Sequence, residues 1–173
     1  MGWNNLSESV CQIACSLAVV GDRWTLLIMR ELSIGINRFD ELQAQTGMSS
    51  HLLSTRLKRM EKDGLIEQRA YSDKPRRHEY LATKKGKELD AVLLVLRAWG
   101  LRWKLSSLGE EPCIDMLYKA TGETMDAAWQ IPPGGPPFTF DDIDASMHPA
   151  FVEERAAKSA AFQIKKKKTS NAT

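Results

Sequence analysis

The sequence predicts a mainly helical fold with one small β-hairpin, of the α+β class. Two short helical patterns joined by a glycine-containing turn are followed directly by two strand-like segments rich in Lys and Arg. A long helical pattern that is apolar over most of its girth comes next, and an irregular extension ends the chain. These observations predict a winged helix-turn-helix that forms dimers through its terminal helices and carries a C-terminal extension.

Two scaffold helices are predicted at the start of the chain. Apolar residues recur at helical spacing over residues 7–20, and Gly21 ends that pattern. Asp22 has the side chain and the position of an N-cap for a second helix, which stops near Gly35. Both helices are expected to support the elements that follow.

The helix-turn-helix is predicted next, where a short helix over 38–45 and a recognition helix over 49–62 are joined by a turn containing Gly47. Ser49 is the expected N-cap of the recognition helix, and Asp63-Gly64 is its expected end. Leu53, Leu57 and Met60 are its expected buried stripe.

A hairpin and a long helix follow the recognition helix. Residues 65–71 and 77–83 are typical of strands, and the basic segment 72–77 between and beside them predicts a wing. Residues 84–105 predict one helix with apolar residues on two sides. Because a domain this small cannot cover both sides, we expect a second subunit to cover one of them.

The extension after residue 106 is expected to be a separate acidic segment, so the predicted division is 1–106 and 107–173. Residues 113–118 suggest a strand, the Pro- and Gly-rich segment 132–137 a linker, and residues 151–164 an alanine-rich helix. Residues 165–173 are expected to be disordered.

Charge is strongly segregated although the formal net charge is only +2. Residues 51–87 hold eleven Lys and Arg against five Asp and Glu, whereas residues 105–164 hold three against ten. A basic block in an otherwise neutral or acidic chain is typical of a surface that binds a polyanion, although charge alone is equally compatible with a solvated face.

Composition and motifs exclude several classes of protein. The longest apolar run has six residues, 91–96, and residues 1–9 lack the features of a signal peptide, so we expect no membrane partner and a cytoplasmic location. Three cysteines are too few for a disulfide framework, and no zinc-site spacing is present, so no metal or cofactor is expected. Motifs for metallohydrolases, serine hydrolases and phosphate loops are missing, which predicts that the protein is not an enzyme.

Several separated blocks together resemble the HxlR-type regulators, which are relatives of the MarR group. The blocks are 21–28 (GDRWTLLI), 38–42 (RFDEL), 53–57 (LSTRL), 63–66 (DGLI) and 79–86 (EYLATKKG), within a similarity that covers about residues 11–103. The resemblance implies a dimeric winged-helix repressor or activator, and we predict a repressor. This sequence departs from the usual pattern of these regulators in two places. Gln12 stands where a proline usually follows the N-terminal cysteine, and the extension after residue 106 is longer than usual.

Double-stranded DNA is the expected partner, with the recognition helix in the major groove and the wing on the backbone or in the minor groove. Arg56 flanks the buried stripe, and an ion pair within the domain is the alternative role for it. His51 either contacts DNA or is an exposed side chain with no role in binding. The wing either contacts DNA or is a turn that faces only solvent. The candidate DNA-binding residues are Ser50, His51, Ser54, Thr55, Arg56, Lys58, Arg59, Lys74, Arg76 and Arg77.

Cys11 and Cys15 lie four residues apart on the predicted first helix, and buried structural thiols are one interpretation of them. The resemblance supplies another, because some HxlR-type regulators sense electrophiles or oxidants through a cysteine that matches Cys11. Thiol modification and a small-molecule effector are therefore both candidate signals. The alternative to a DNA-binding regulator is a winged-helix adaptor that binds other proteins without specific DNA binding.

Overall fold

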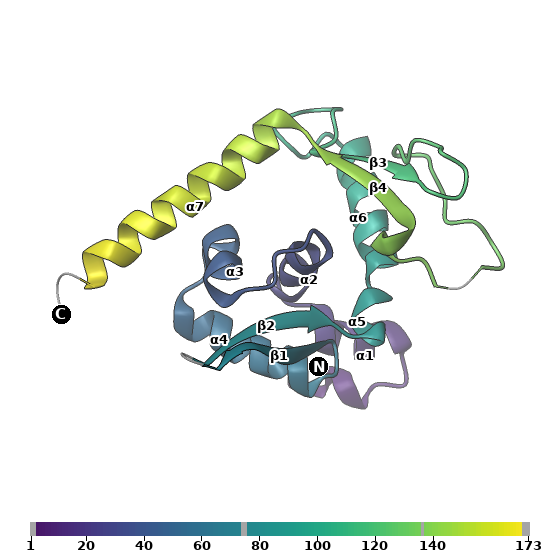
Figure 1. Ribbon diagram of the computed structural model, residues 1–173. Coiled ribbons are helices and arrows are strands. Elements are labelled where there is room, and N and C mark those ends of the chain that lie inside the picture. Colours follow the sequence, from purple (N-terminus) through teal and green to yellow (C-terminus); the bar gives the residue numbers. More distant parts are fainter. Residues whose placement is uncertain (1–2, 74–75, 136, 171–173) are drawn as a thin grey trace. The chain divides into compact units, whose positions relative to one another are not determined.

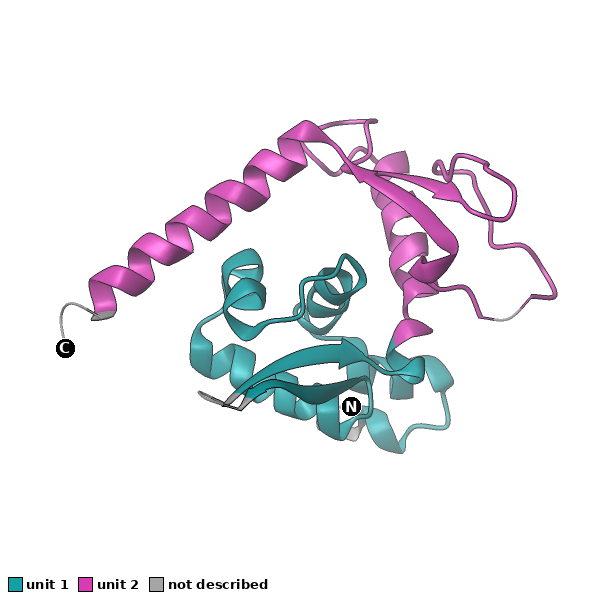
Figure 2. Ribbon diagram, in the orientation of Figure 1, with its two compact units in different colours: residues 1–86 teal, residues 87–173 magenta. Residues whose placement is uncertain are grey.

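The structure, a computed structural model, describes residues 3–73, 76–135 and 137–170. It contains two compact units, residues 1–86 and residues 87–173, which are described separately (Figure 2). This division falls earlier in the chain than the predicted one after residue 106. The domain boundary expected after residue 106 stays a prediction.

The first unit is the winged helix-turn-helix (Figure 1). A 3₁₀ turn, η1 (Trp3–Glu8), precedes the α1 helix (Gln12–Val20), so the single helix predicted over residues 7–20 is wrong. The interruption has a local cause. Ser9 Oγ accepts the backbone N–H of Cys11 at 3.1 Å, and a serine that binds nearby backbone in this way competes with helix formation.

The helix-turn-helix and its wing are confirmed close to their predicted positions. Their elements are α2 (Thr25–Ser33), α3 (Phe39–Thr46), α4 (Ser50–Lys62), β1 (Ile66–Asp73) and β2 (Arg76–Ala82). β1 and β2 form an antiparallel hairpin with a bulge between Ala70 and Ser72. Gly47 turns the chain from α3 into α4 with φ of 71°, a left-handed conformation that glycine adopts without steric cost.

The core of this unit joins the helices to the hairpin. Ile28 and Met29 from α2, Leu42 from α3 and Leu53 and Leu57 from α4 are essentially inaccessible to solvent. Leu65 and Ile66 extend the core to the hairpin, where β1 packs against α4 and β2 packs against α2 and α3. Packing of this kind sets the position of the recognition helix.

The long helix predicted over residues 84–105 is wrong, because the chain forms two helices, α5 (Lys84–Lys87) and α6 (Asp90–Arg102). Residues on either side of the break are held by different neighbours. A Cβ on Gly86 would lie 2.1 Å from the Leu65 carbonyl oxygen, so this backbone is closely packed in the first unit. Asp90 instead accepts the backbone N–H of Phe140 at 2.9 Å in the second unit.

The second unit has a small core of its own, built on α6 and an antiparallel hairpin of β3 (Ile114–Tyr118) and β4 (Ile143–Met147). The predicted strand over 113–118 is confirmed as β3. The short turn η2 (Phe140–Asp142) leads into β4. Aromatic rings of Tyr118, Trp129, Phe138 and Phe140 contact one another in sequence, with centroids 5.2 to 5.9 Å apart.

The last element of the described residues is a long helix, α7 (Pro149–Ser170). The expectation of disorder is therefore wrong for residues 165–170, while residues 171–173 lie outside the described part. Alanine has the highest helix propensity, and lysines in the last turn interact favourably with the helix dipole. These two local effects explain why the helix continues through Lys165–Lys168.

Among the described residues, no single helix is long and apolar enough to cross a bilayer. α1 and α2 taken together have sufficient length and apolar content, but they are bent by 73° with respect to each other.

Candidate nucleic-acid interface

The recognition helix α4 presents a mostly polar surface opposite its buried side, with Leu52 as an exposed apolar residue. The predicted cap is confirmed, since Ser49 Oγ accepts the backbone N–H of Leu52 at 3.3 Å. Leu53, Leu57 and Met60 point into the core as predicted. Ser54 is half-buried, and the exposed candidates are Ser50, His51, Thr55, Lys58 and Arg59.

Arg56 forms the intradomain ion pair that was the alternative role for it. Its Nη1 lies 3.0 Å from Asp22 Oδ2, and the Arg56 side chain is only 19% exposed. The same carboxylate accepts the backbone N–H groups of Trp24 at 2.8 Å and Thr25 at 3.0 Å, and the Thr25 hydroxyl. Asp22 thus links the start of α2 to the recognition helix.

Arg59 makes a second link between the recognition helix and the scaffold. Its Nη2 donates to the Ala18 carbonyl oxygen at 2.9 Å, and its Nε lies 3.5 Å from Asp63 Oδ2. Arg56 and Arg59 therefore hold α4 in place through α1 and α2. Lys58 lies between them in sequence and has an exposed side chain.

The wing supplies further cations at the side of the recognition helix. Arg77 is exposed on β2, where its backbone is opposite Ser72. Arg76 is described only through its backbone, which pairs with Asp73, and Lys74 lies outside the described residues.

Charge pairs at the base of the wing connect it to the loop before α3. Arg69 donates to Glu79 at 2.6 and 2.8 Å, and Asn37 donates to the other oxygen of Glu79 at 3.2 Å. The guanidinium of exposed Arg38 lies 4.9 Å from the Tyr71 ring centre. Sequence reasoning missed the contacts of Asp22, Arg38 and Glu79, because pairs between distant residues leave no periodic signal.

Tyr80 lies on the inner part of the wing and remains a neutral phenol. Burial raises its pKa above the ordinary value, and the hydrogen bond from Gln68 to its hydroxyl partly opposes that increase.

The cysteines differ in accessibility, and all three are free thiols. Cys11 is exposed at the N-cap position of α1, so it is not the buried structural thiol of the alternative interpretation. Cys15 donates through Sγ to the Ser9 carbonyl oxygen at 2.9 Å and is less accessible. Cys113 lies in the second unit next to β3 and is half-buried.

Each unit exposes large apolar side chains. In the first unit, Val10 and Ile13 are 97% and 72% exposed. In the second, one face of α6 is packed through Asp90 and Leu94, whereas its other face exposes a stripe at helical spacing. The α6 stripe consists of Val92, Val95, Leu96, Trp99 and Trp103.

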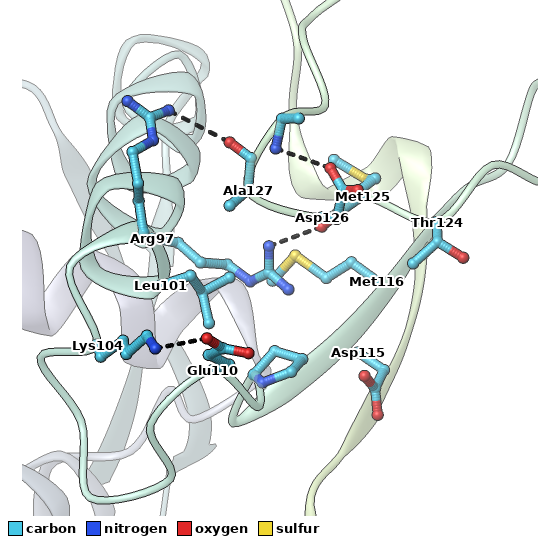
Figure 3. A pocket seen from close by; sticks show the side chains of 13 residues that line it. Arg97, Leu101, Lys104, Glu110, Asp115, Met116, Thr124, Met125, Asp126 and Ala127 are labelled. Carbon is cyan, nitrogen blue, oxygen red and sulfur yellow. Dashed lines mark hydrogen bonds and ion pairs between the residues drawn. The ribbon is translucent and has the colours of Figure 1, made fainter.

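The second unit also contains a pocket of about 490 Å³ between α6 and the segments that follow it (Figure 3). Arg97 crosses its floor, donating to the carbonyl oxygens of Met125 at 2.8 Å and Ile114 at 3.0 Å. Its Nε is buried and has no hydrogen-bond partner among the described residues. Desolvation lowers the pKa of Arg97.

The wall of the pocket combines apolar side chains with a charged rim. Leu101, Met116 and Met125 supply apolar surface, as Figure 3 shows. At the rim Lys104 is paired with Glu110 at 2.6 Å, and this contact lowers the pKa of the Glu110 carboxyl.

Comparison with known proteins shows the same similarity in sequence and in structure. A family model described as HxlR-like helix-turn-helix matches residues 19–107. Two uncharacterised HTH-type transcriptional regulators, Mb3122 of Mycobacterium bovis and Rv3095 of Mycobacterium tuberculosis, are each 34% identical over 142 residues, or 82% of this chain and 89% of the relative. Because 142 residues exceed the part of the chain that ends at residue 107, this similarity extends into the C-terminal extension.

Among solved structures, PA1607, described as a candidate transcription factor, is 26% identical and covers 81% of this chain and 96% of its own, with a TM-score of 0.61. The candidate HTH-type transcriptional regulator ytcD is 27% identical and covers 56% of this chain and all of its own, with a TM-score of 0.52.

Proposed function

The chain belongs to the HxlR-like helix-turn-helix family of transcription regulators and is not an enzyme, and on that premise we propose that it is a dimeric repressor of one specific DNA site. The observation that carries the proposal is the exposed polar face of α4 beside a cationic hairpin. An α-helix fits the major groove, where polar side chains distinguish base pairs by their edges. The proposed location is the cytoplasm, where a bacterial-type regulator meets its DNA.

The proposed division of labour follows exposure. Ser50, His51, Ser54, Thr55 and Lys58 face the bases or the adjoining phosphates. Arg56 and Arg59 contact DNA from positions that their protein partners hold, which reduces the entropy lost on binding. Lys74, Arg76 and Arg77 of the wing contact the sugar–phosphate backbone or the minor groove.

Dimerisation is proposed through the α6 stripe. Trp99 and Trp103 are 52% and 64% exposed, and contiguous apolar side chains of this size mark interaction surfaces on soluble proteins. A two-fold dimer would place two recognition helices in major grooves about one helical turn, roughly 34 Å, apart.

Two signals are proposed for regulation. The pocket at Arg97 suits an amphipathic small molecule, because Leu101 contributes accessible apolar surface and Lys104 and Glu110 contribute charged groups at its rim. Cys11 is the accessible thiol of α1, so it is the proposed site of oxidation or alkylation. Diamide should weaken DNA binding by the wild type and leave Cys11→Ser unaffected; equal responses would exclude Cys11 as the sensor.

The test of DNA binding begins with selection from a random duplex library, followed by mobility-shift titrations of the selected site and random DNA at two salt concentrations. We expect the selection to enrich a pseudo-palindromic sequence. The protein should bind this sequence at least about 10³-fold more tightly than random DNA. An adaptor would enrich no sequence and bind poorly at either salt concentration.

A matched pair of variants locates the interface. Thr55→Glu adds a negative charge to the exposed face of α4 and should abolish binding to the selected site. Ser107→Glu makes the same change of charge at an exposed position of the second unit and should bind like the wild type. Equal binding by the two variants would contradict a DNA-binding role for α4.

A further inference from the structure

Among the described side chains of helix α7, the buried ones lie near its beginning. The backbone N–H of His148 donates to the Cys113 carbonyl oxygen at 3.0 Å, and Phe151 and Arg155 are the buried side chains of the first two turns. From residue 156 to residue 169 every side chain is exposed except Phe162, which is half-buried. Figure 1 shows the helix leaving the β3–β4 hairpin as a straight rod.

The projecting part of α7 is purely cationic. Its acidic residues, Glu153 and Glu154, are confined to the first two turns, and no Asp or Glu follows them. Lys158, which is paired with Glu154, and the consecutive Lys165, Lys166, Lys167 and Lys168 follow instead. Successive helical residues are about 100° apart, so four in a row surround the axis and present charge to any side.

Helical structure keeps this charge away from the acidic remainder of the unit. At about 1.5 Å per residue, the four lysines lie roughly 20–25 Å along the helix from Phe151. A flexible tail of the same sequence could fold back on the carboxylates of residues 105–154, whereas a rod cannot. The lysines are thus presented to an external polyanion.

The composition of the rod favours nucleic acid over a membrane or an apolar protein groove. Phe162 and Ile164 are its large apolar residues beyond Arg155, and the others are alanine or polar. Such a small apolar face gives little free energy for insertion into lipid. Duplex DNA carries one negative charge per about 1.7 Å of its axis and needs no apolar contact.

We propose that residues 156–170, the basic arm, bind the phosphates of DNA that flanks the recognition site. This inference rests on the proposed DNA-binding function and assigns a role to an extension that the winged helix does not explain. Each protomer would contribute one arm, and the contacts would be independent of the flanking sequence.

The test replaces Lys165, Lys166, Lys167 and Lys168 together by Gln, which removes four charges and retains good helix propensity. The matched control replaces the same four by Arg, which retains the charges. Both full-length variants and the wild type are titrated with the selected site, either bare or extended on each side by about two helical turns, roughly 20 base pairs. Far-UV circular dichroism verifies that helix content is unchanged.

On the extended duplex we expect the Gln variant to bind at least tenfold more weakly than the wild type, and its salt slope to be flatter by about 0.9 for each phosphate that the arm no longer neutralises. On the bare site the difference should shrink, and the Arg variant should match the wild type on both. If the Gln variant and the wild type bind the extended duplex with equal affinity and slope, the basic arm does not contact DNA.

Two further outcomes separate this proposal from the preceding one. If the wild type binds no duplex, the DNA-binding function itself fails. If the Gln variant differs from the wild type in its mass in solution but not in its salt slope, the lysines mediate self-association, and the proposed DNA contact is wrong.

Discussion

At the scale of single residues, Asp22 makes more contacts than the N-cap role that the sequence predicted for it. One carboxylate accepts N–H groups at the start of α2 and is also paired with Arg56 of the recognition helix. Asp22 and Arg56 are mostly shielded from solvent, at 25% and 19% exposure, so screening weakens their attraction only in part. The pair therefore orients α4 relative to α2.

The first prediction concerns this pair. In a double-mutant cycle of Asp22→Asn and Arg56→Ala, chemical unfolding should show a coupling free energy of about 1 kcal/mol, because each change removes the same ion pair. Arg56→Ala should also weaken binding to the selected site by about 1–3 kcal/mol and to random DNA much less, as expected for a residue that binds a base. Equal losses of affinity on both DNAs would make Arg56 a positioning residue.

The second prediction concerns close packing at Gly86. An added Cβ would lie 2.1 Å from the Leu65 carbonyl oxygen and 3.0 Å from Met29 Cε, so the backbone would have to move. Gly86→Ala should lower the free energy of unfolding by about 1–3 kcal/mol. Gly135→Ala is the control, since nothing lies within 4 Å of its added Cβ, and it should change stability by less than about 0.5 kcal/mol.

At the scale of elements, the proposed division of labour gives base contacts to α4 and phosphate contacts to the hairpin. α4 exposes the short polar side chains of Ser50 and Thr55 together with Lys58, Arg59 and Lys62, and the accessible groups of the wing include the long cationic side chain of Arg77. Short side chains require close approach to base edges, while long cationic ones reach the backbone.

The third prediction follows from that division. Arg77→Ala should weaken binding to the selected site and to random DNA by the same factor and flatten the salt slope by about 0.9, since one phosphate is no longer neutralised. Thr55→Ala should instead affect the selected site more than random DNA. A sequence-dependent effect of Arg77→Ala would mean that the wing reads bases.

At the scale of the whole molecule, the proposed function requires a dimer. Val10 and Ile13 in the first unit and the α6 stripe in the second are large apolar side chains that a single chain leaves exposed. Covering them with the same surfaces of a second chain would produce the two-fold symmetry that a palindromic DNA site requires.

The fourth prediction tests this dimer. Trp99→Glu places a charge in the α6 stripe, so the mass in solution should fall from that of a dimer to that of a monomer, with loss of footprinting on one half-site. Val152→Glu, at a 48% exposed position of α7, is the control and should remain dimeric. A wild-type protein that is monomeric at micromolar concentration would contradict the proposed assembly.

Most of the winged helix was predictable because its signals are local. The cap at Ser49, the turn at Gly47 and the stripe of Leu53, Leu57 and Met60 depend on neighbouring residues, and the structure confirms all three. Family membership was predictable for a related reason, since several separated blocks in a fixed order are specific.

By itself, therefore, the sequence determined the order and type of the elements in the winged helix, and the family to which the chain belongs. Only the tertiary structure decided that Arg56 is paired with Asp22, that the helix is interrupted between α5 and α6, and that the extension forms a pocket. These features arise from contacts between residues far apart in the chain. Helix periodicity and capping are set within a few residues, whereas such contacts depend on how whole elements pack.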